Sequence, residues 1–267
     1  MISITIAFIA FACIYGGALA GLFMQRFLPE HHLRAESKDA IKVGAGLIAT
    51  MAALVLGLLV GSAKSSFDAM NTGLTQGAAK AIMFDRILAH YGPEAKDARD
   101  ELRQTIAKTV ASIWPEENTS GTGLKAVEGS AGPERVAEKV QQLSPQTESQ
   151  RSIRSQALQM SVDLLQFRWL LIEQEHNALP TPFLVVLIFW LSILNLTYGL
   201  VAPRNLTVIS VMFVCALSLA GAIFLILEMN NPLEGMIKVS SAPLRNALEH
   251  IGKVDPPSGP TWQKRPE

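Results

Sequence analysis

The chain of 267 residues carries 23 basic and 23 acidic side chains, so its formal net charge is zero. This balance argues against nucleic acid as a partner and against an acidic substrate. Hydrophobic residues make up 49% of the chain, which suits a soluble core and membrane helices equally, so the distribution of charge along the chain has to decide between them.

Four long apolar windows contain no Asp, Glu, Lys or Arg: residues 2–23, 43–63, 182–202 and 206–227. A helix of roughly 20 apolar residues crosses the hydrocarbon core of a bilayer, and helices in soluble proteins of this size rarely run so long without a charge. We therefore predict an all-α integral membrane protein. Its four transmembrane helices are expected over residues 2–23, 43–63, 182–202 and 206–228.

The first window has one feature of a cleaved signal peptide, because "ALAG" at residues 18–21 has the small residues that signal peptidase prefers. The preceding "MISIT" has no Lys or Arg, however, and the apolar run continues to Phe23, beyond an ordinary signal sequence. We predict an uncleaved helix. Residues 1–63 then form a first transmembrane hairpin.

The third and fourth windows form a second hairpin, residues 182–229, joined by "VAPRN". Pro203 stops one helix, and we expect Arg204 in the headgroup layer as an interfacial anchor.

Three pairs of small residues in the windows have the four-residue spacing that lets helix backbones approach closely, either within one chain or between subunits. These helix-packing pairs are Gly17 and Gly21, Gly57 and Gly61, and Ala216 and Ala220.

Four polar residues inside the windows are candidates to line a water path: Thr50, Ser192, Asn195 and Thr197. Polar groups deep in a membrane usually face a partner or a cavity. The alternative is that the hydroxyls bond to their own helix and that Asn195 clamps a neighbouring helix. No Asp, Glu, Lys or His lies inside any window, which argues against a proton-coupled carrier.

Residues 64–181, between the second and third windows, are predicted to form a soluble helical stalk domain. Apolar residues from Phe67 to Tyr91 recur every three or four positions, which is the period of a helix. No breaker separates this stripe from the second window. We therefore expect one continuous helix from about residue 43 to about residue 90.

Further helices are predicted to start at Pro93, Pro133 and Pro145. The Gly- and Ser-rich residues 115–132 are predicted to be a mobile connector. In the last segment, residues 230–267, we expect an amphipathic helix at 242–251 that docks on the stalk or lies at the membrane surface, followed by a disordered tail.

No enzyme motif is present, since the sequence lacks a glycine-rich phosphate loop, a nucleophile elbow and the His-Glu-x-x-His spacing. His31 and His32 are adjacent, but neighbouring side chains on a helix point apart and no other His or Cys cluster supports a metal site. Cys13 and Cys215 both lie inside windows, so no disulfide framework is expected. We predict no enzymatic activity, no cofactor and no metal.

The positive-inside rule does not orient the chain. With four crossings, both termini and the stalk share one face of the membrane, and each face has five flanking basic residues. They are Arg26, Arg34, Lys38, Lys42 and Arg204 on the loop face, and Lys64, Lys80, Arg168, Lys238 and Arg245 on the stalk face.

Six phrases spread from Leu28 to Leu248 carry a family resemblance: "LPEHHL...SKD", "IATMAALVLGLLVGSAKSSFD", "YGPEAKDAR", "FRWLLIEQ", "FWLSILNLTYGLVAPRN" and "SSAPLRNAL". Together they resemble the bacterial members of the bestrophin-like domain family, membrane proteins of unknown function. The family name points to bestrophins, pentameric anion channels in which two helix pairs flank a cytosolic helical domain. The resemblance implies a bacterial inner-membrane protein with its stalk and both termini in the cytosol. The aromatic neck and calcium clasp of bestrophins find no residue-by-residue match here.

Two functions of different classes follow. The first is an oligomeric channel, with inorganic anions as the implied ligand, in which the second window lines a central path. This window is chosen for its small residues Gly44, Gly46, Thr50, Gly57 and Gly61. The second is a non-conducting membrane scaffold or signalling module whose stalk binds a partner protein. The expected partners are the lipid bilayer and, in a homo-oligomer, further copies of the chain, but not nucleic acid.

Overall fold

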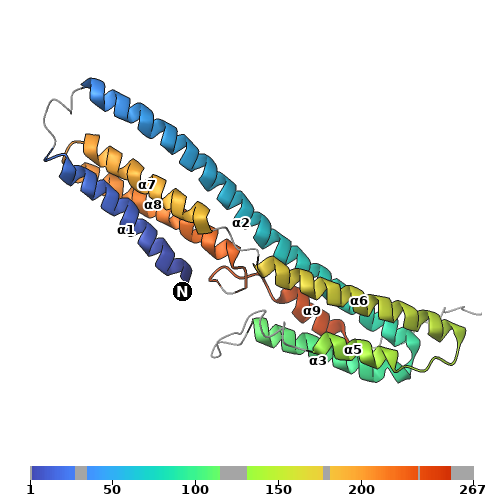
Figure 1. The fold of residues 1–267 in the computed structure, drawn as a ribbon. Helices are drawn as coiled ribbons and strands as arrows, with labels where there is room; N and C mark the ends of the chain where they lie inside the picture. The colour runs from blue at the N-terminus through green and yellow to red at the C-terminus, as the bar shows by residue number, and fades with distance from the viewer. Residues whose placement is uncertain (1, 28–34, 115–130, 177–180, 234, 254–267) are drawn as a thin grey trace, which may run out of the picture. The chain divides into compact units, whose positions relative to one another are not determined.

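The computed structural model describes residues 2–27, 35–114, 131–176, 181–233 and 235–253, and every regular element within these ranges is helical (Figure 1). The chain divides into two compact units. The first unit comprises Met1–Ala69 and Asn177–Lys238, and the second comprises Met70–His176 and Val239–Glu267. Residues 115–130 of the predicted connector, the tail after residue 253 and the pair His31 and His32 lie outside the described ranges.

The first unit contains α1 (Ile2–Met24), the beginning of α2 (Ala35–Tyr91), α7 (Thr181–Val201) and α8 (Leu206–Asn230). Each of these helices is long and apolar enough to cross a membrane, which confirms the predicted all-α class with four long apolar helices. As predicted from the absence of a helix breaker, α2 continues without interruption to Tyr91. It begins at Ala35 rather than near residue 43, since charged residues do not stop a helix as they stop a membrane span.

Glycine allows α1 and α7 to pack backbone against backbone. A Cβ atom added at Gly17 would lie 2.6 Å from the backbone oxygen of Ser192. At Gly21 it would overlap the backbone oxygen of Leu196, and at Gly199 that of Ala18. Because any larger residue would push the helices apart, these three glycines set the spacing between α1 and α7.

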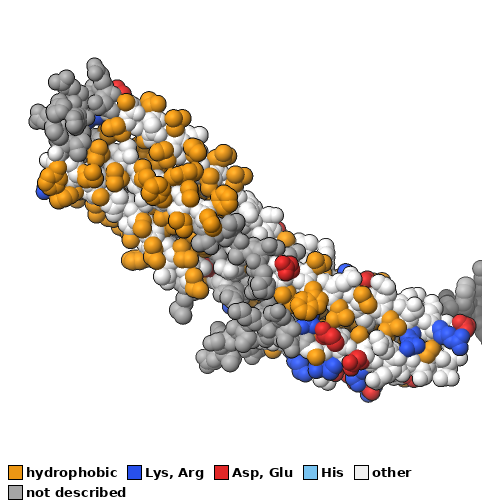
Figure 2. Space-filling view, in the orientation of Figure 1, with side chains coloured by type: hydrophobic (Ala, Val, Ile, Leu, Met, Phe, Trp, Pro, Cys, Tyr) orange, Lys and Arg blue, Asp and Glu red, His pale blue; other side chains and the backbone are white. Residues whose placement is uncertain are grey.

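The core of the first unit takes residues from all four of its helices. Ile14 of α1, Leu187 of α7 and Ile223 of α8 are fully buried in one cluster. From α2 the cluster receives a stripe of small and apolar residues: Ala45, Ala52, Leu59 and Ala63. Many other apolar side chains of these helices are exposed, and Figure 2 shows them covering the visible face of the first unit. Such an apolar exterior suits lipid.

Among its described residues, the second unit contains the end of α2 and the helices α3 (Lys96–Ile113), α5 (Gly132–Gln141), α6 (Glu148–His176) and α9 (Ala242–His250). After α2, Gly92 adopts a φ of 127°, which favours glycine, and the short 3-10 turn Pro93–Ala95 leads into α3. The helix α9 packs against α3 with Leu244 and Ala247 buried. In Figure 2, Lys, Arg, Asp and Glu side chains gather on the visible face of this unit.

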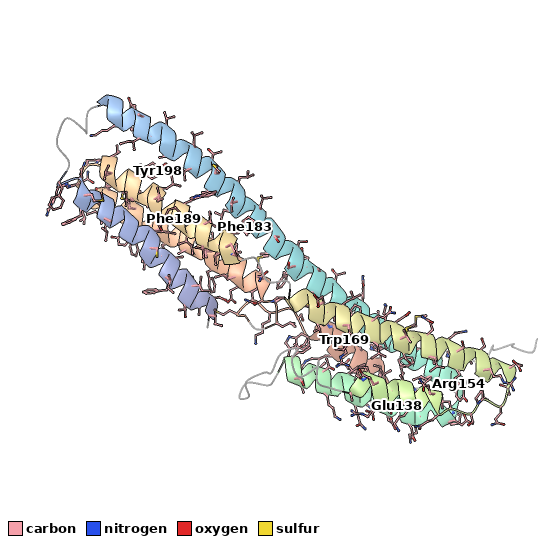
Figure 3. The ribbon with its side chains drawn as sticks, viewed as in Figure 1. Glu138, Arg154, Trp169, Phe183, Phe189 and Tyr198 are labelled. Atoms are coloured by element: carbon pink, nitrogen blue, oxygen red, sulfur yellow. The ribbon has the colours of Figure 1, made fainter. Side chains whose placement is uncertain are left out.

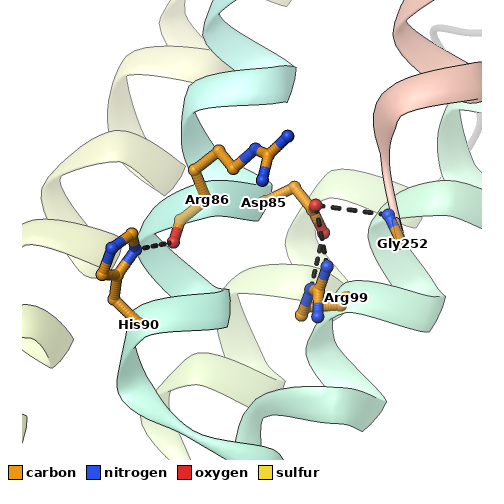
Figure 4. Close-up of polar contacts among 5 residues, drawn as sticks. All are labelled: Asp85, Arg86, His90, Arg99 and Gly252. Atoms are coloured by element: carbon orange, nitrogen blue, oxygen red, sulfur yellow. Dashed lines mark hydrogen bonds and ion pairs between the residues drawn. The ribbon is translucent and has the colours of Figure 1, made fainter. Parts of the chain in front are cut away.

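A buried ion pair joins three segments of the second unit (Figure 4). Asp85 of α2 is 1% exposed and receives two hydrogen bonds from the Arg99 guanidinium of α3, at 2.7 and 2.9 Å. The backbone N–H of Gly252, directly after α9, donates to the same carboxylate at 3.2 Å. The hydrogen bond with Asp85 raises the pKa of Arg99, so this guanidinium stays charged.

A second contact holds the start of the same C-terminal segment. The indole Nε1 of Trp114, at the end of α3, donates to the backbone oxygen of Val239 at 2.9 Å. Val239 and Ile251 are both buried, so the segment from Val239 to Gly252 is fixed to the second unit at both of its ends.

Candidate functional site

In the first unit, α2 presents three different faces. Its buried stripe, described above, packs into the core. A second face carries large apolar side chains that are more than half exposed: Val43, Leu47, Met51, Leu54 and Leu58. A third set of exposed residues is small, namely Gly46, Thr50, Ala53, Gly57 and Gly61, and Val60, 43% exposed, lies at its edge beside Ala53. We call this third set the small-residue face. Its members recur every three or four positions and therefore lie along one side of the helix.

The small-residue face is open in the single chain. At Gly46, Gly57 and Gly61, no atom lies within 4 Å of the position that a Cβ would occupy. Thr50 donates its hydroxyl to the Gly46 backbone oxygen at 2.9 Å, so its hydroxyl oxygen remains available as an acceptor. At the end of this face, Lys64 pairs with Asp68 one turn further on.

The polar residues predicted in α7 bond to their own helix. Ser192 donates to the Ile188 backbone oxygen at 2.7 Å, and Thr197 donates to that of Ile193 at 2.8 Å. The side-chain amide of Asn195, which is 7% exposed, donates to the Leu191 backbone oxygen at 3.0 Å. Thr50 of α2 is exposed, whereas Asn195 of α7 is buried.

The predicted packing pairs occupy different surroundings. Gly17 and Gly21 face α7 at backbone distance, and Ala216 and Ala220 of α8 are buried. Gly57 and Gly61 belong instead to the open small-residue face. Equal spacing therefore leads to a contact within the chain at the first two pairs and to an unfilled surface at the third.

The hairpin between α7 and α8 is fixed to the end of α1. Arg204, the predicted interfacial anchor, donates from Nε to the Gln25 side-chain oxygen at 3.0 Å, and Gln25 donates to the Ala202 backbone oxygen at 3.4 Å. Asn205 caps α8 by accepting from the Val208 N–H at 2.8 Å, a common helix start. The part played by Gln25 was missed, because a single Gln after an apolar window carries no sequence signal.

Residues 12–244 match the model of the Bestrophin-like domain family. The chain belongs to this family. Its resemblance to bestrophin-like proteins, predicted from the six phrases, is thereby confirmed. The chain is also similar to the crystal structure of a singly substituted bacterial bestrophin homolog from Klebsiella pneumoniae, with a TM-score of 0.62 and 13% sequence identity. The match covers 92% of this chain and 99% of the other. Among curated proteins, none matches.

The family match, the similar fold and the four long apolar helices together identify this chain as a membrane protein of the bestrophin type. A likeness at this low identity shows the fold alone, so the roles of individual residues rest on their own geometry. Across the residues that the structure describes, no group of three His, Cys, Asp or Glu side chains is placed to hold a metal ion. Cys13 and Cys215 are free thiols, both exposed on the first unit.

Glu228 is a buried acidic residue of the first unit. The sequence did not reveal its role. It lies in the last turn of α8, is 2% exposed, and accepts hydrogen bonds from the backbone N–H groups of Met236 and Ile237. A carboxylate held by backbone N–H groups orders the segment that donates them. Glu228 therefore shapes the loop after α8, in which Met236 is 74% exposed.

Proposed function

We propose that the protein is an oligomeric ion channel in which the small-residue face of α2 lines the conducting path. The observation that carries this proposal is the contrast between the two exposed faces of α2. A face toward lipid is expected to carry large apolar side chains, as Leu47, Met51 and Leu58 do. A face that lacks them leaves room around an axis and exposes backbone and hydroxyl oxygens, which are groups that ions can use.

The path has to form between copies of the chain, because the small-residue face lies on the outside of a single chain. A closed ring places the same face of every copy around one axis. Bestrophin resemblance suggests five copies and inorganic anions as the permeant species. It also suggests the inner membrane, with the second unit and both termini in the cytosol. No catalytic step, cofactor or metal enters this proposal.

The alternative is a non-conducting scaffold or signalling module, and two observations favour it. Thr50, Ser192, Asn195 and Thr197 all donate to their own helix, as residues in a simple bundle would. In the second unit, α6 also exposes Val162, Trp169 and Leu170, and Figure 3 labels Trp169 there. An exposed apolar patch of this kind on a soluble surface suits a protein partner.

Chloride efflux from liposomes containing the full-length protein tests the channel, with the oligomer mass measured by light scattering in the same preparation. We expect Gly57→Leu to remove the efflux, because a bulky side chain from every copy would fill the path. The matched control is Gly44→Leu. Gly44 is also exposed with open space around it, but it lies on the side of Leu47, Met51 and Leu58, so this variant should conduct normally.

The oligomer mass separates the two proposals. Loss of efflux from a Gly57→Leu ring of unchanged mass supports a pore. Loss accompanied by dissociation makes the small-residue face a contact surface between helices. A well-folded wild-type monomer or dimer without efflux would exclude the channel and leave the scaffold.

A further inference from the structure

A cavity of about 540 Å³ lies in the first unit between α2, α7 and α8. All three helices contribute to its wall from their membrane-crossing parts, so the cavity opens into the apolar layer of a bilayer. Its size falls in the range of small-ligand sites, roughly 300–1,000 Å³. A cavity of this size beside lipid has to be filled in the membrane.

The wall of the cavity suits an apolar occupant. Most of the lining is Ala, Leu, Val and Met, and no Asp, Glu, Lys, Arg or His is part of it. Asn195 also lines the cavity, but one N–H of its side-chain amide is used within α7 by the hydrogen bond to the Leu191 backbone oxygen. Water or an ion would find too few polar partners here, whereas a hydrocarbon chain would find apolar contact along most of the surface.

One end of the cavity is polar. Tyr198, in the last turn of α7, and Thr207, in the first turn of α8, both line it, and Figure 3 shows Tyr198 between α7 and α2. The exposed Arg204 lies three residues before Thr207, and the exposed Arg26 lies in the turn after α1, next to the Gln25 that Arg204 contacts. This end therefore combines hydroxyl groups with positive charge, which attracts anionic lipid headgroups.

We propose that the cavity binds an acyl chain of an anionic phospholipid whose phosphate lies at the Arg204 end. Charge decides between lipid and a second copy of the chain. In a ring, a second copy would bring its own Arg204 to the same depth of the membrane and add like charge, while a phosphate neutralises it. Lipid binding in this cavity does not require conduction, although Ala53 belongs both to the cavity wall and to the small-residue face.

Native mass spectrometry of the full chain in detergent, titrated with phosphatidylglycerol, tests the proposal. Val211 lines the cavity and is 56% exposed, so Val211→Trp fills the space without entering the core. We expect the affinity of Val211→Trp for phosphatidylglycerol to fall roughly tenfold or more, because the indole takes the place of two or more buried methylene groups of the acyl chain. The matched control is Val214→Trp, since Val214 is 59% exposed on the same helix but does not line the cavity.

Two further variants complete the test. Ala53→Phe fills the cavity from α2 and should reproduce the loss should Val211→Trp fail to fold. Arg204→Gln should remove the preference for phosphatidylglycerol over phosphatidylcholine with the same acyl chains. Equal binding by the two valine variants, or no headgroup preference in the wild type, overturns the proposal. A changed oligomer mass with unchanged lipid binding in Val211→Trp also overturns it, and assigns the cavity to a second copy.

Discussion

At Gly17, Gly21 and Gly199, a hydrogen atom in place of a methyl group determines how closely α1 and α7 approach. In each case the space for a Cβ is taken by a backbone oxygen of the facing helix. Backbone atoms cannot rotate away as a side chain can, so even alanine forces the helices apart. Single residues thus control a helix contact that an apolar composition would tolerate in many arrangements.

Gly21→Ala should lower the free energy of unfolding by about 1–3 kcal/mol, the usual cost of overpacking. The control is Gly16→Ala, where no atom lies within 4 Å of the new methyl group. That change should be neutral or should stabilise by up to about 1 kcal/mol, because alanine favours the helix. Thermal unfolding of the detergent-solubilised protein measures both, and equal shifts would contradict the role given to Gly21.

The helix α2 shows what sequence can predict at the scale of an element. Charge-free windows predicted the four spans, because a bilayer excludes charge whatever the packing. Small-residue spacing did not reveal which pair meets a neighbour, since Gly17 and Gly21 contact α7 while Gly57 and Gly61 face open space. The spacing shows only that one side of a helix carries small residues. Which helix packs against that side depends on residues elsewhere in the chain.

The ion pair between Asp85 and Arg99 connects α2 with α3, and its removal should be costly. Asp85→Asn leaves Arg99, whose side chain is 12% exposed, without its counter-charge. Stability should fall by about 3 kcal/mol, as for other buried pairs broken on one side. The control is Glu148→Gln, which breaks the largely exposed pair with Arg151 and should cost less than about 1 kcal/mol. Denaturant unfolding measures the free energy of unfolding of both variants. Similar losses of stability would contradict the expectation that the buried pair contributes more than the exposed one.

At the scale of the whole molecule, the family and the membrane class could be predicted. Long apolar windows and family phrases are read directly from the sequence and do not depend on how the helices pack. The limits of the two compact units fall at Ala69 and Lys238, beyond the apolar windows, which end at residues 63 and 227. Apolar windows mark where lipid contact ends, whereas the units are groups of residues that lie close together in space, and such contacts continue past that point.

Truncation tests how the second unit is completed. A chain ending at Lys253 keeps the contacts of Val239 and Gly252 with Trp114 and Asp85, and we expect it to unfold at the wild-type temperature. A chain ending at Lys238 loses both contacts and uncovers the surface beneath α9, so its unfolding temperature should fall by several degrees. Circular dichroism of the two purified chains decides, and identical transitions would show that α9 adds no stability.

The contact of α1 with the α7–α8 hairpin also has a consequence for synthesis. The hydrogen bond between Gln25 and Ala202 joins residues 177 positions apart. At about 5–20 residues per second, a ribosome needs roughly ten to thirty seconds to complete that interval. Throughout this time α1 resides in the membrane without its partner and with its glycines toward lipid. Its retention there therefore depends on its own hydrophobicity until α7 is inserted.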